Sequence, residues 1–229
     1  MKVEGSKETF GVRRTLSEPV AVSYPNFAKP LSSRQESPSL LNLYWRFFVA
    51  GITRQAQTGA VVPSQRFLID RMISPIPHEF SGEVIELGSG TGVLTLRLAM
   101  QRLACRVLAC EINTSLAREV QARVAAAGLQ HRVRVVSSPA QAVLKQMKQR
   151  PAQERADFII SGIPLGNLVK ETAQALIEQI FTALRPGGMY IQFQHSLMDR
   201  KKIKRTFSRL RTVPVLLNFP PAFVYYAWK

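Results

Sequence analysis

The alternation of short apolar segments with amphipathic ones after residue 81 is the strongest constraint on the fold. Apolar segments rich in β-branched residues predict five strands, at 82–88, 106–112, 133–138, 157–162 and 189–195. The intervening segments predict helices at 94–103, 115–128, 140–149 and 171–184, followed by a basic helix around 199–210 and terminal strands at 213–219 and 222–228. Such alternation implies an α/β fold with a parallel sheet covered by helices on both faces. Ligands then bind beyond the carboxyl ends of the strands.

The composition is that of a globular chain with a strong excess of positive charge. Of the 229 residues 46% are hydrophobic, enough to bury a sizeable core. Cys105 and Cys110 are the two cysteines, which excludes a disulfide scaffold and offers no zinc-type spacing, so no metal is expected. Lysine and arginine number 31 against 15 acidic residues, and the net charge of +16 attracts polyanions such as nucleic acid or an anionic membrane face.

Composition divides the chain into three parts. Residues 1–38 carry four prolines among polar residues and are expected to form a disordered tail. Residues 39–80 are expected to form amphipathic helices, at 40–54 and 64–72, and residues 81–229 the alternating domain. The sequence contains neither an apolar stretch of membrane-spanning length nor a signal-type N-terminus, so we expect a cytoplasmic location.

A glycine-rich loop and an acidic residue follow the first two predicted strands. The segment ELGSGTG at 86–92 ends a strand and opens a helix, where glycines let the backbone approach a ligand. Its spacing differs from the dinucleotide fingerprint, and it lacks the GK[ST] of a phosphate loop. Glu111 ends the next strand, where a carboxylate is placed to accept two hydrogen bonds from a ribose diol. Together the two features indicate an adenosine-type cofactor.

This joint pattern resembles the class I S-adenosylmethionine (SAM) methyltransferases. The resemblance implies a Rossmann-like domain with a mostly parallel seven-stranded sheet flanked by helices and an N-terminal helical lid. It also implies that Glu86 reaches the methionyl amine, that the loop lines the methionine and ribose, that Glu111 holds the ribose and that Ile112 packs against adenine. The implied cofactor-binding residues are Gly59, Ser64, Glu86, Gly88, Ser89, Gly90, Gly92, Glu111, Ile112, Asn113, Ser138, Pro139 and Ala140. The sequence departs from the pattern after the third strand, where Ser138 replaces the usual acid.

The fourth predicted strand ends in the sequence S-G-I-P, formed by Ser161, Gly162, Ile163 and Pro164. It stands where amine-methylating relatives carry an N-P-P-Y type turn, whose carbonyl oxygens hold an attacking amine in line with the methyl group. An alkylammonium with a pKa of about 10.4 must first lose a proton. His195 after the fifth strand is a candidate base, although a structural histidine is the commoner reading, and Asp157 is the acid considered near the turn.

Ordered motifs further resemble the bacterial phospholipid N-methyltransferase family. They are TGAVVPS (58–64), ELGSGTG, SGIPL (161–165), RPGGMYIQF (185–193) and NFPPAFVY (218–225), within a resemblance that covers about residues 40–229. The family methylates phosphatidylethanolamine with SAM, up to three times, toward phosphatidylcholine. The resemblance therefore implies a phospholipid substrate and a cytoplasmic enzyme bound peripherally to the inner face of the membrane.

Aromatic and basic residues fit such a substrate. The candidates for substrate or membrane contact are Tyr44, Trp45, Phe47, Phe48, Phe219 and Tyr225. Seven lysines and arginines at 200–211 form a second basic cluster suited to an anionic surface. The plainer alternatives are a helix that covers the core, aromatic residues packed in a sheet, and a solvated basic face.

Two other functions remain open on the sequence. An RNA adenine N6-methyltransferase would explain the net charge and the SQRFL segment at 64–68, which resembles rRNA adenine dimethyltransferases. Leu165 argues against it, because an aromatic residue usually stacks a flipped base there. A non-catalytic SAM-fold protein that binds membrane or nucleic acid is the third possibility, since the acid after the third strand is missing.

Overall fold

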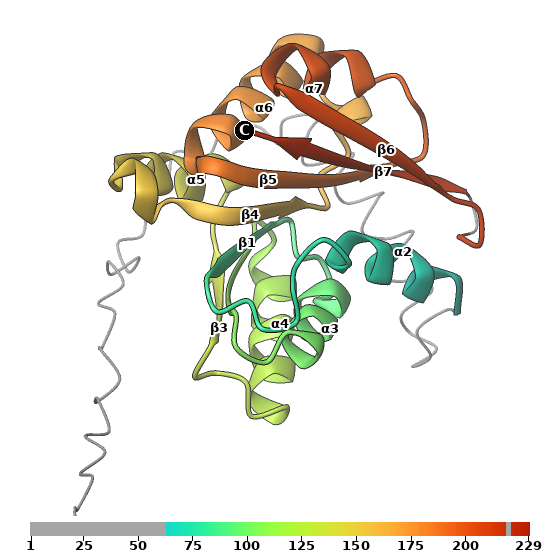
Figure 1. The fold of residues 1–229 in the computed structure, drawn as a ribbon. Coiled ribbons are helices and arrows are strands. Elements are labelled where there is room, and N and C mark those ends of the chain that lie inside the picture. The colour runs from blue at the N-terminus through green and yellow to red at the C-terminus, as the bar shows by residue number, and fades with distance from the viewer. Residues whose placement is uncertain (1–62, 219–220) are drawn as a thin grey trace, which may run out of the picture. The chain divides into compact units, whose positions relative to one another are not determined.

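A single mixed sheet forms the centre of the described structure. The computed structural model describes residues 63–218 and 221–229 (Figure 1). Its seven strands lie in the order β3-β2-β1-β4-β5-β7-β6. Their bounds are β1 Glu83–Leu87, β2 Arg106–Glu111, β3 Val133–Ser137, β4 Ala156–Ser161, β5 Leu184–Gln194, β6 Arg209–Val215 and β7 Ala222–Trp228. Strands β1 to β5 pair in parallel, and β7 runs antiparallel to β5 and β6.

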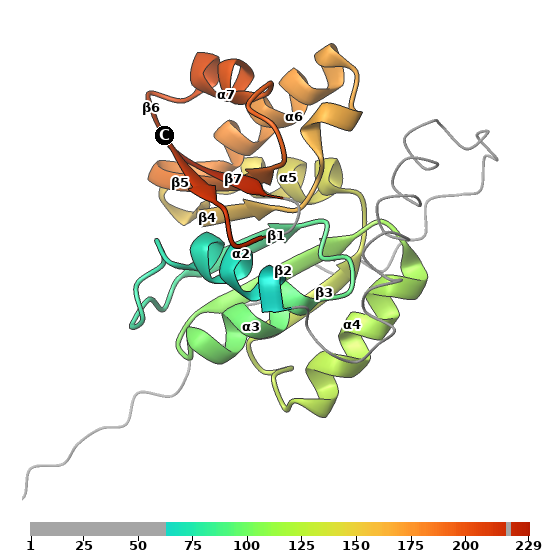
Figure 2. The ribbon, with the colours of Figure 1, turned by 90° about the vertical axis from the view of Figure 1, so that its right-hand side faces the viewer.

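Helices cover both faces of this sheet, as Figures 1 and 2 show. One face carries α2 Pro63–Ile73, α3 Val93–Gln101 and α4 Thr114–Ala126. The other face carries α5 Ala140–Gln149, α6 Lys170–Ala183 and α7 Arg200–Thr206, with two short 3-10 helices, η1 Ala152–Glu154 and η2 Leu165–Asn167, in the connections. Because β1 is covered on both faces, all five of its residues are buried. The predicted α/β fold with a mostly parallel seven-stranded sheet is confirmed.

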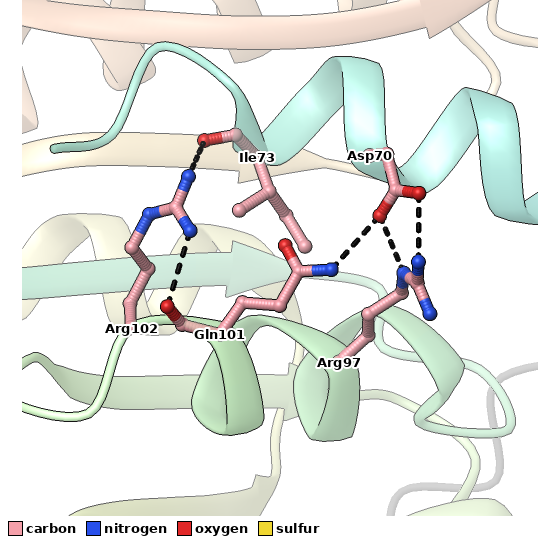
Figure 3. A network of polar contacts seen from close by, with 5 residues as sticks. All are labelled: Asp70, Ile73, Arg97, Gln101 and Arg102. Atoms are coloured by element: carbon pink, nitrogen blue, oxygen red, sulfur yellow. Dashed lines mark hydrogen bonds and ion pairs between the residues drawn. The ribbon is translucent and has the colours of Figure 1, made fainter. Parts of the chain in front are cut away.

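Polar contacts fix α2 onto α3, the helix that follows the glycine-rich loop (Figure 3). Asp70 of α2 accepts hydrogen bonds from Arg97 Nε at 2.5 Å, Arg97 Nη2 at 2.7 Å and Gln101 Nε2 at 3.0 Å. The Arg97 guanidinium lowers the pKa of Asp70, so the carboxylate stays charged at neutral pH. Arg102 is buried and donates to the carbonyl oxygens of Ile76 at 2.6 Å and Ile73 at 3.4 Å. These contacts give the buried guanidinium of Arg102 carbonyl partners at the end of α2, where the Ile73 carbonyl oxygen also accepts the N–H of Ile76.

The structure corrects the prediction for the C-terminal segments. The basic helix ends at Thr206, not near residue 210, so Arg209 and Arg211 lie on β6 and not on the helix. The strand predicted at 213–219 begins four residues earlier and ends at Val215. As an edge strand, β6 tolerates Pro214, and Val215 is its one buried residue. The strand predicted at 222–228 is confirmed.

Several predictions for the N-terminal parts lie outside the described residues. These are the tail at 1–38, the helix at 40–54, and the candidate residues Tyr44, Trp45, Phe47, Phe48 and Gly59. The helix predicted at 64–72 corresponds to α2, and Ser64 lies in its first turn. Among the residues described, no helix is long and apolar enough to span a membrane.

Candidate active site

The glycine-rich loop between β1 and α3 has a backbone that only glycine adopts readily. Gly90 and Gly92 have positive φ angles of 55° and 78°. A Cβ on Gly92 would lie 2.7 Å from Val120 Cγ1 of α4, whereas a Cβ on Gly90 would meet no atom within 4 Å. Gly92 is therefore required for packing beneath the loop, while Gly90 borders open space at the carboxyl ends of the strands.

Glu111 at the end of β2 fastens this loop to the neighbouring strand. Its side chain is fully buried and accepts hydrogen bonds from the backbone N–H groups of Gly90 and Asn113, each at 2.9 Å. Backbone bonds from Gly88 and Ser89 to the carbonyl oxygen of Cys110 reinforce the same link. The acidic strand end that the sequence analysis singled out thus lies against the glycine-rich loop.

Glu86 is a buried acid within β1, one strand away from Glu111. Thr95 Oγ1 of α3 donates a hydrogen bond of 2.5 Å to its Oε2. Burial raises the pKa of Glu86 to about 7, an effect that the Thr95 bond opposes and the Glu111 charge increases. A cationic group bound here would favour the charged carboxylate and recover part of the cost of burying it.

The residues around the loop fit SAM. Ser89 Oγ is buried without a hydrogen-bond partner among the described residues, which suits a site that a polar ligand completes. Ile112 is exposed directly after Glu111 and offers an apolar surface to a nucleobase. Ser138 donates its backbone N–H to the carbonyl oxygen of Glu111, Pro139 is exposed and Ala140 is buried. The end of β3 thus places backbone groups, a hydroxyl group and apolar side chains at this edge of the sheet, whereas the class I methyltransferase pattern more often has an acidic residue there.

The S-G-I-P turn after β4 packs against the glycine-rich loop. Gly162 donates its N–H to the carbonyl oxygen of Leu87, and a Cβ on Gly162 would lie 2.9 Å from the carbonyl oxygen of Gly88. Ser161 is buried, and its Oγ accepts a hydrogen bond from the N–H of Ile163 at 3.2 Å. The two motifs that lie about 75 residues apart in the sequence are therefore in contact, as expected for the ends of adjacent parallel strands.

Gln192 of β5 fixes the carbonyl group of the turn. It lies opposite Ser161 in the sheet, and its Nε2 donates to the carbonyl oxygens of Ile163 at 3.0 Å and Phe193 at 2.7 Å. Tyr190 donates its hydroxyl to Gln192 Oε1 at 2.6 Å, which orients the amide. The Gln192 and Tyr190 pair was not among the predicted site residues, although both lie in the RPGGMYIQF motif.

His195 and Tyr225 have contacts that explain their places in the structure. His195 is exposed, and its Nδ1 lies 3.0 Å from the carbonyl oxygen of Pro221, so Nδ1 carries the proton in this contact. Tyr225 is fully buried and donates its hydroxyl to the carbonyl oxygen of Ser196 at 2.9 Å. These contacts favour the sheet-packing alternative for Tyr225, and a substrate role for either residue stays a prediction. Phe219 lies outside the described residues.

A buried acid near the turn is Asp199, which the sequence analysis missed. Its Oδ1 pairs with Lys202 Nζ at 2.7 Å, while its Oδ2 has no hydrogen-bond partner within the described part of the chain. A Cβ on Gly166, just beyond the S-G-I-P turn, would lie 3.5 Å from Oδ2. Asp157, the acid considered earlier, lies at the opposite end of β4 and pairs with Arg185 at 2.5 Å. The signal for Asp199 was its place between the fifth strand and the basic helix.

The comparisons with known proteins agree with this fold. The methyltransferase domain family matches residues 84–188. The chain carries a class I SAM-dependent methyltransferase domain. The predictions of a methyltransferase and of SAM as its cofactor are confirmed at this level. In the described residues, no group of three or more metal-ligating side chains comes together.

Two curated proteins and one solved structure illustrate the similarity. An ornithine lipid N-methyltransferase of Singulisphaera acidiphila is 29% identical over 169 residues, which cover 73% of this chain and 86% of that protein. A probable dimethyladenosine transferase of Drosophila melanogaster is 36% identical over 86 residues, 38% of this chain and 28% of that protein. An O-methyltransferase from Bacillus cereus, solved with SAH, has a TM-score of 0.57 at 18% identity, covers 81% of this chain and 91% of its own, and shows the fold alone.

Proposed function

We propose that this protein transfers methyl groups from SAM to the amine of phosphatidylethanolamine and its methylated intermediates, toward phosphatidylcholine, at the inner membrane surface. The observation that carries the proposal is the S-G-I-P turn, whose Ile163 carbonyl is fixed by Gln192 and which touches the glycine-rich loop through Gly162. A carbonyl oxygen that is fixed beside SAM can accept a hydrogen bond from an amine N–H, which suits an amine as the group that receives the methyl. The lipid class is supported by the similarity to an ornithine lipid N-methyltransferase over 73% of the chain.

The chemistry asks little of the protein beyond position and proton removal. SAM supplies a methyl group already activated by its sulfonium, so the acceptor must be neutral, close and aligned. In our proposal the carbonyl oxygen of Ile163 accepts a hydrogen bond from the acceptor amine. A lipid ammonium has a pKa close to that of lysine, about 10.4, and must release a proton before it attacks. Asp199 is our preferred group to hold the ammonium and take that proton, because its Oδ2 lacks a hydrogen-bond partner among the described residues.

A methyl-transfer assay tests the proposal directly. Purified full-length protein and SAM with a labelled methyl group are offered three acceptors in parallel: phosphatidylethanolamine in vesicles with phosphatidylglycerol, ornithine lipid in the same vesicles, and unmodified structured RNA. We expect label in phosphatidylethanolamine, with products carrying one to three methyl groups. Label in ornithine lipid alone would support a lipid amine as the acceptor but would refute phosphatidylethanolamine as the substrate. An absence of label in every acceptor, with SAM bound, would reject these acceptors and point to another amine.

An RNA adenine N6-methyltransferase is the second candidate. The 86-residue match to a probable dimethyladenosine transferase favours it, and the net charge of +16 suits a polyanion. Leu165 is fully buried in η2 and offers no exposed aromatic ring to a flipped base after the turn. Label in the RNA arm of the same assay would establish this candidate and reject the lipid proposal.

A further inference from the structure

Two connections at the carboxyl edge of the sheet each expose a pair of large apolar side chains. The connection between β5 and α7 carries Leu197 and Met198, which are 48% and 82% exposed. The turn between β6 and β7 carries Leu216 and Leu217, which are 75% and 67% exposed. Both lie at the same edge, because Gln194 at the end of β5 pairs with Phe223 at the start of β7. We call these four residues the apolar edge.

Hydrogen bonds hold the two connections together. His195 of the first connection contacts the carbonyl oxygen of Pro221 of the second at 3.0 Å. Tyr225 of β7 donates its hydroxyl to the carbonyl oxygen of Ser196 at 2.9 Å. His195 and Tyr225 thus link the two connections that carry the apolar edge.

The apolar edge lies on the acceptor side of the active site. The apolar edge follows β5 and β6 in one half of the sheet. The glycine-rich loop follows β1 and Glu111 ends β2, and both of these strands lie in the other half. The S-G-I-P turn follows β4, which is the direct neighbour of β5. The acceptor turn is therefore one strand away from the connection that carries Leu197 and Met198.

Basic residues follow the apolar edge directly. Arg200 and Lys201 begin α7 immediately after Met198 and Asp199, and Lys204 and Arg205 lie one turn further along the helix. All four are exposed, while Asp199 is buried and already paired with Lys202. Exposed apolar side chains beside a basic helix are the combination that binds the headgroup region of an anionic bilayer. Exposed apolar patches rimmed by polar residues mark contacts with a protein, a membrane or a ligand.

We propose that the apolar edge inserts into the interface of an anionic lipid bilayer and that α7 contacts the lipid phosphates. This docking places the acceptor turn at headgroup level. The proposal deepens the proposed function, because it names the surface through which a lipid substrate reaches the site. The binding step itself requires no methyl transfer and is measured separately.

The first experiment is co-sedimentation of the full-length protein with vesicles of phosphatidylethanolamine and phosphatidylglycerol. Two double variants test the edge, Leu197→Ser with Met198→Ser and Leu216→Ser with Leu217→Ser. The matched control is Met100→Ser with Leu103→Ser, which changes side chains that are 58% and 71% exposed at the opposite edge of the sheet. We expect each edge variant to bind at least about tenfold more weakly, since burial of one large apolar side chain typically contributes that much. The control variant is expected to bind like the wild type.

Three outcomes in sedimentation would overturn the docking proposal. Edge variants that sediment like the wild type, or a control that weakens equally, would show that the apolar edge is not the membrane contact. A wild-type dimer in analytical ultracentrifugation that the edge variants convert to monomer would assign the edge to self-association. SAM affinity, measured by calorimetry, is expected to stay unchanged in every variant and shows that the site has kept its fold.

A second acceptor separates this proposal from the proposed function. Short-chain phosphatidylethanolamine dissolved below its micelle concentration needs no docking, so edge variants are expected to methylate it at the wild-type rate while they lose transfer to vesicles. An equal loss on both acceptors would place the edge in the site itself and overturn the docking role. Failure of the wild type on both acceptors would refute the proposed function, and the sedimentation result would still decide the docking.

Discussion

Glu86 is expected to make the folded state less stable as the pH rises. Burial in β1 raises the pKa of this carboxyl from 4.5 to about 7. The unfolded chain therefore releases the proton at a lower pH than the folded chain does. Between these two values the folded state binds more protons, so its free energy of unfolding falls as the pH rises, and the effect is complete above about pH 7.

The size of this effect follows from the difference between the two pKa values. A difference of about 2.5 units corresponds to about 3 kcal/mol, at about 1.4 kcal/mol per unit. The substitution Glu86→Gln isolates it, because glutamine has nearly the same shape, accepts the Thr95 bond through its amide oxygen and stays neutral at every pH. Groups that do not interact with Glu86 titrate alike in the two proteins, so they cancel in the difference.

Urea denaturation across this pH range is the assay. The free energy of unfolding of the Glu86→Gln protein, relative to the wild type, is expected to rise by about 3 kcal/mol between about pH 4 and pH 8. The reasoning would be refuted by a difference that stays constant with pH, since that result would mean that Glu86 titrates in the folded protein as it does in the unfolded chain.

Three further substitutions test the site. Gly90→Val forces a β-branched residue into a backbone with φ near 55° beside the cofactor space, so SAM binding in calorimetry is expected to disappear, and an unchanged affinity would contradict the cofactor site. Gly162→Ala places a Cβ 2.9 Å from the carbonyl oxygen of Gly88, so the free energy of unfolding in urea is expected to fall by about 1 to 3 kcal/mol and methyl transfer to become slower. A wild-type rate would argue against contact between the S-G-I-P turn and the glycine-rich loop. Asp199→Asn is expected to slow methyl transfer by about a hundredfold without loss of SAM affinity, and an equal loss in Lys202→Met would assign Asp199 to a structural ion pair.

The sequence was sufficient to predict the features that depend on local pattern. The strands β1 to β4 and the second part of β5 were predicted from their apolar runs, whereas β5 begins at Leu184, which was predicted to end the preceding helix. The glycine-rich loop and Glu111 were predicted because their residue types are unusual at strand ends. The start of the edge strand β6 was misplaced, because Arg209 and Leu210 were taken as the end of a basic helix and the strand was predicted to begin at residue 213. Strand β6 lies at the edge of the sheet and, among the described strands, pairs with β7 alone. This pairing is a tertiary contact, which the local sequence pattern does not encode.

The acids near the turn illustrate the same limit. Asp157 and Asp199 both flank strands in the sequence, but Asp157 lies at the amino end of β4 and pairs with Arg185, whereas Asp199 follows β5 and lies near Gly166. Tertiary packing determines which acid lies near the turn. Asp199 is buried there at the start of α7, which packs against β6, β7 and α6. Such packing brings together segments that are far apart in the chain, so a single sequence does not reveal it.

The distribution of contacts also indicates where acceptor choice resides. Main-chain hydrogen bonds link the glycine-rich loop to β2 and the S-G-I-P turn to β1, so these elements depend on the fold more than on particular side chains. An O-methyltransferase shares that fold with a TM-score of 0.57 at only 18% identity, so the fold by itself does not select nitrogen, oxygen or lipid. The features that we propose to serve the acceptor, Gln192, Asp199 and the apolar edge, all lie on β5 or on the connections after β5 and β6. Changes of acceptor are therefore expected to follow from substitutions in these segments, while substitutions in the loop after β1 abolish SAM binding for every acceptor alike.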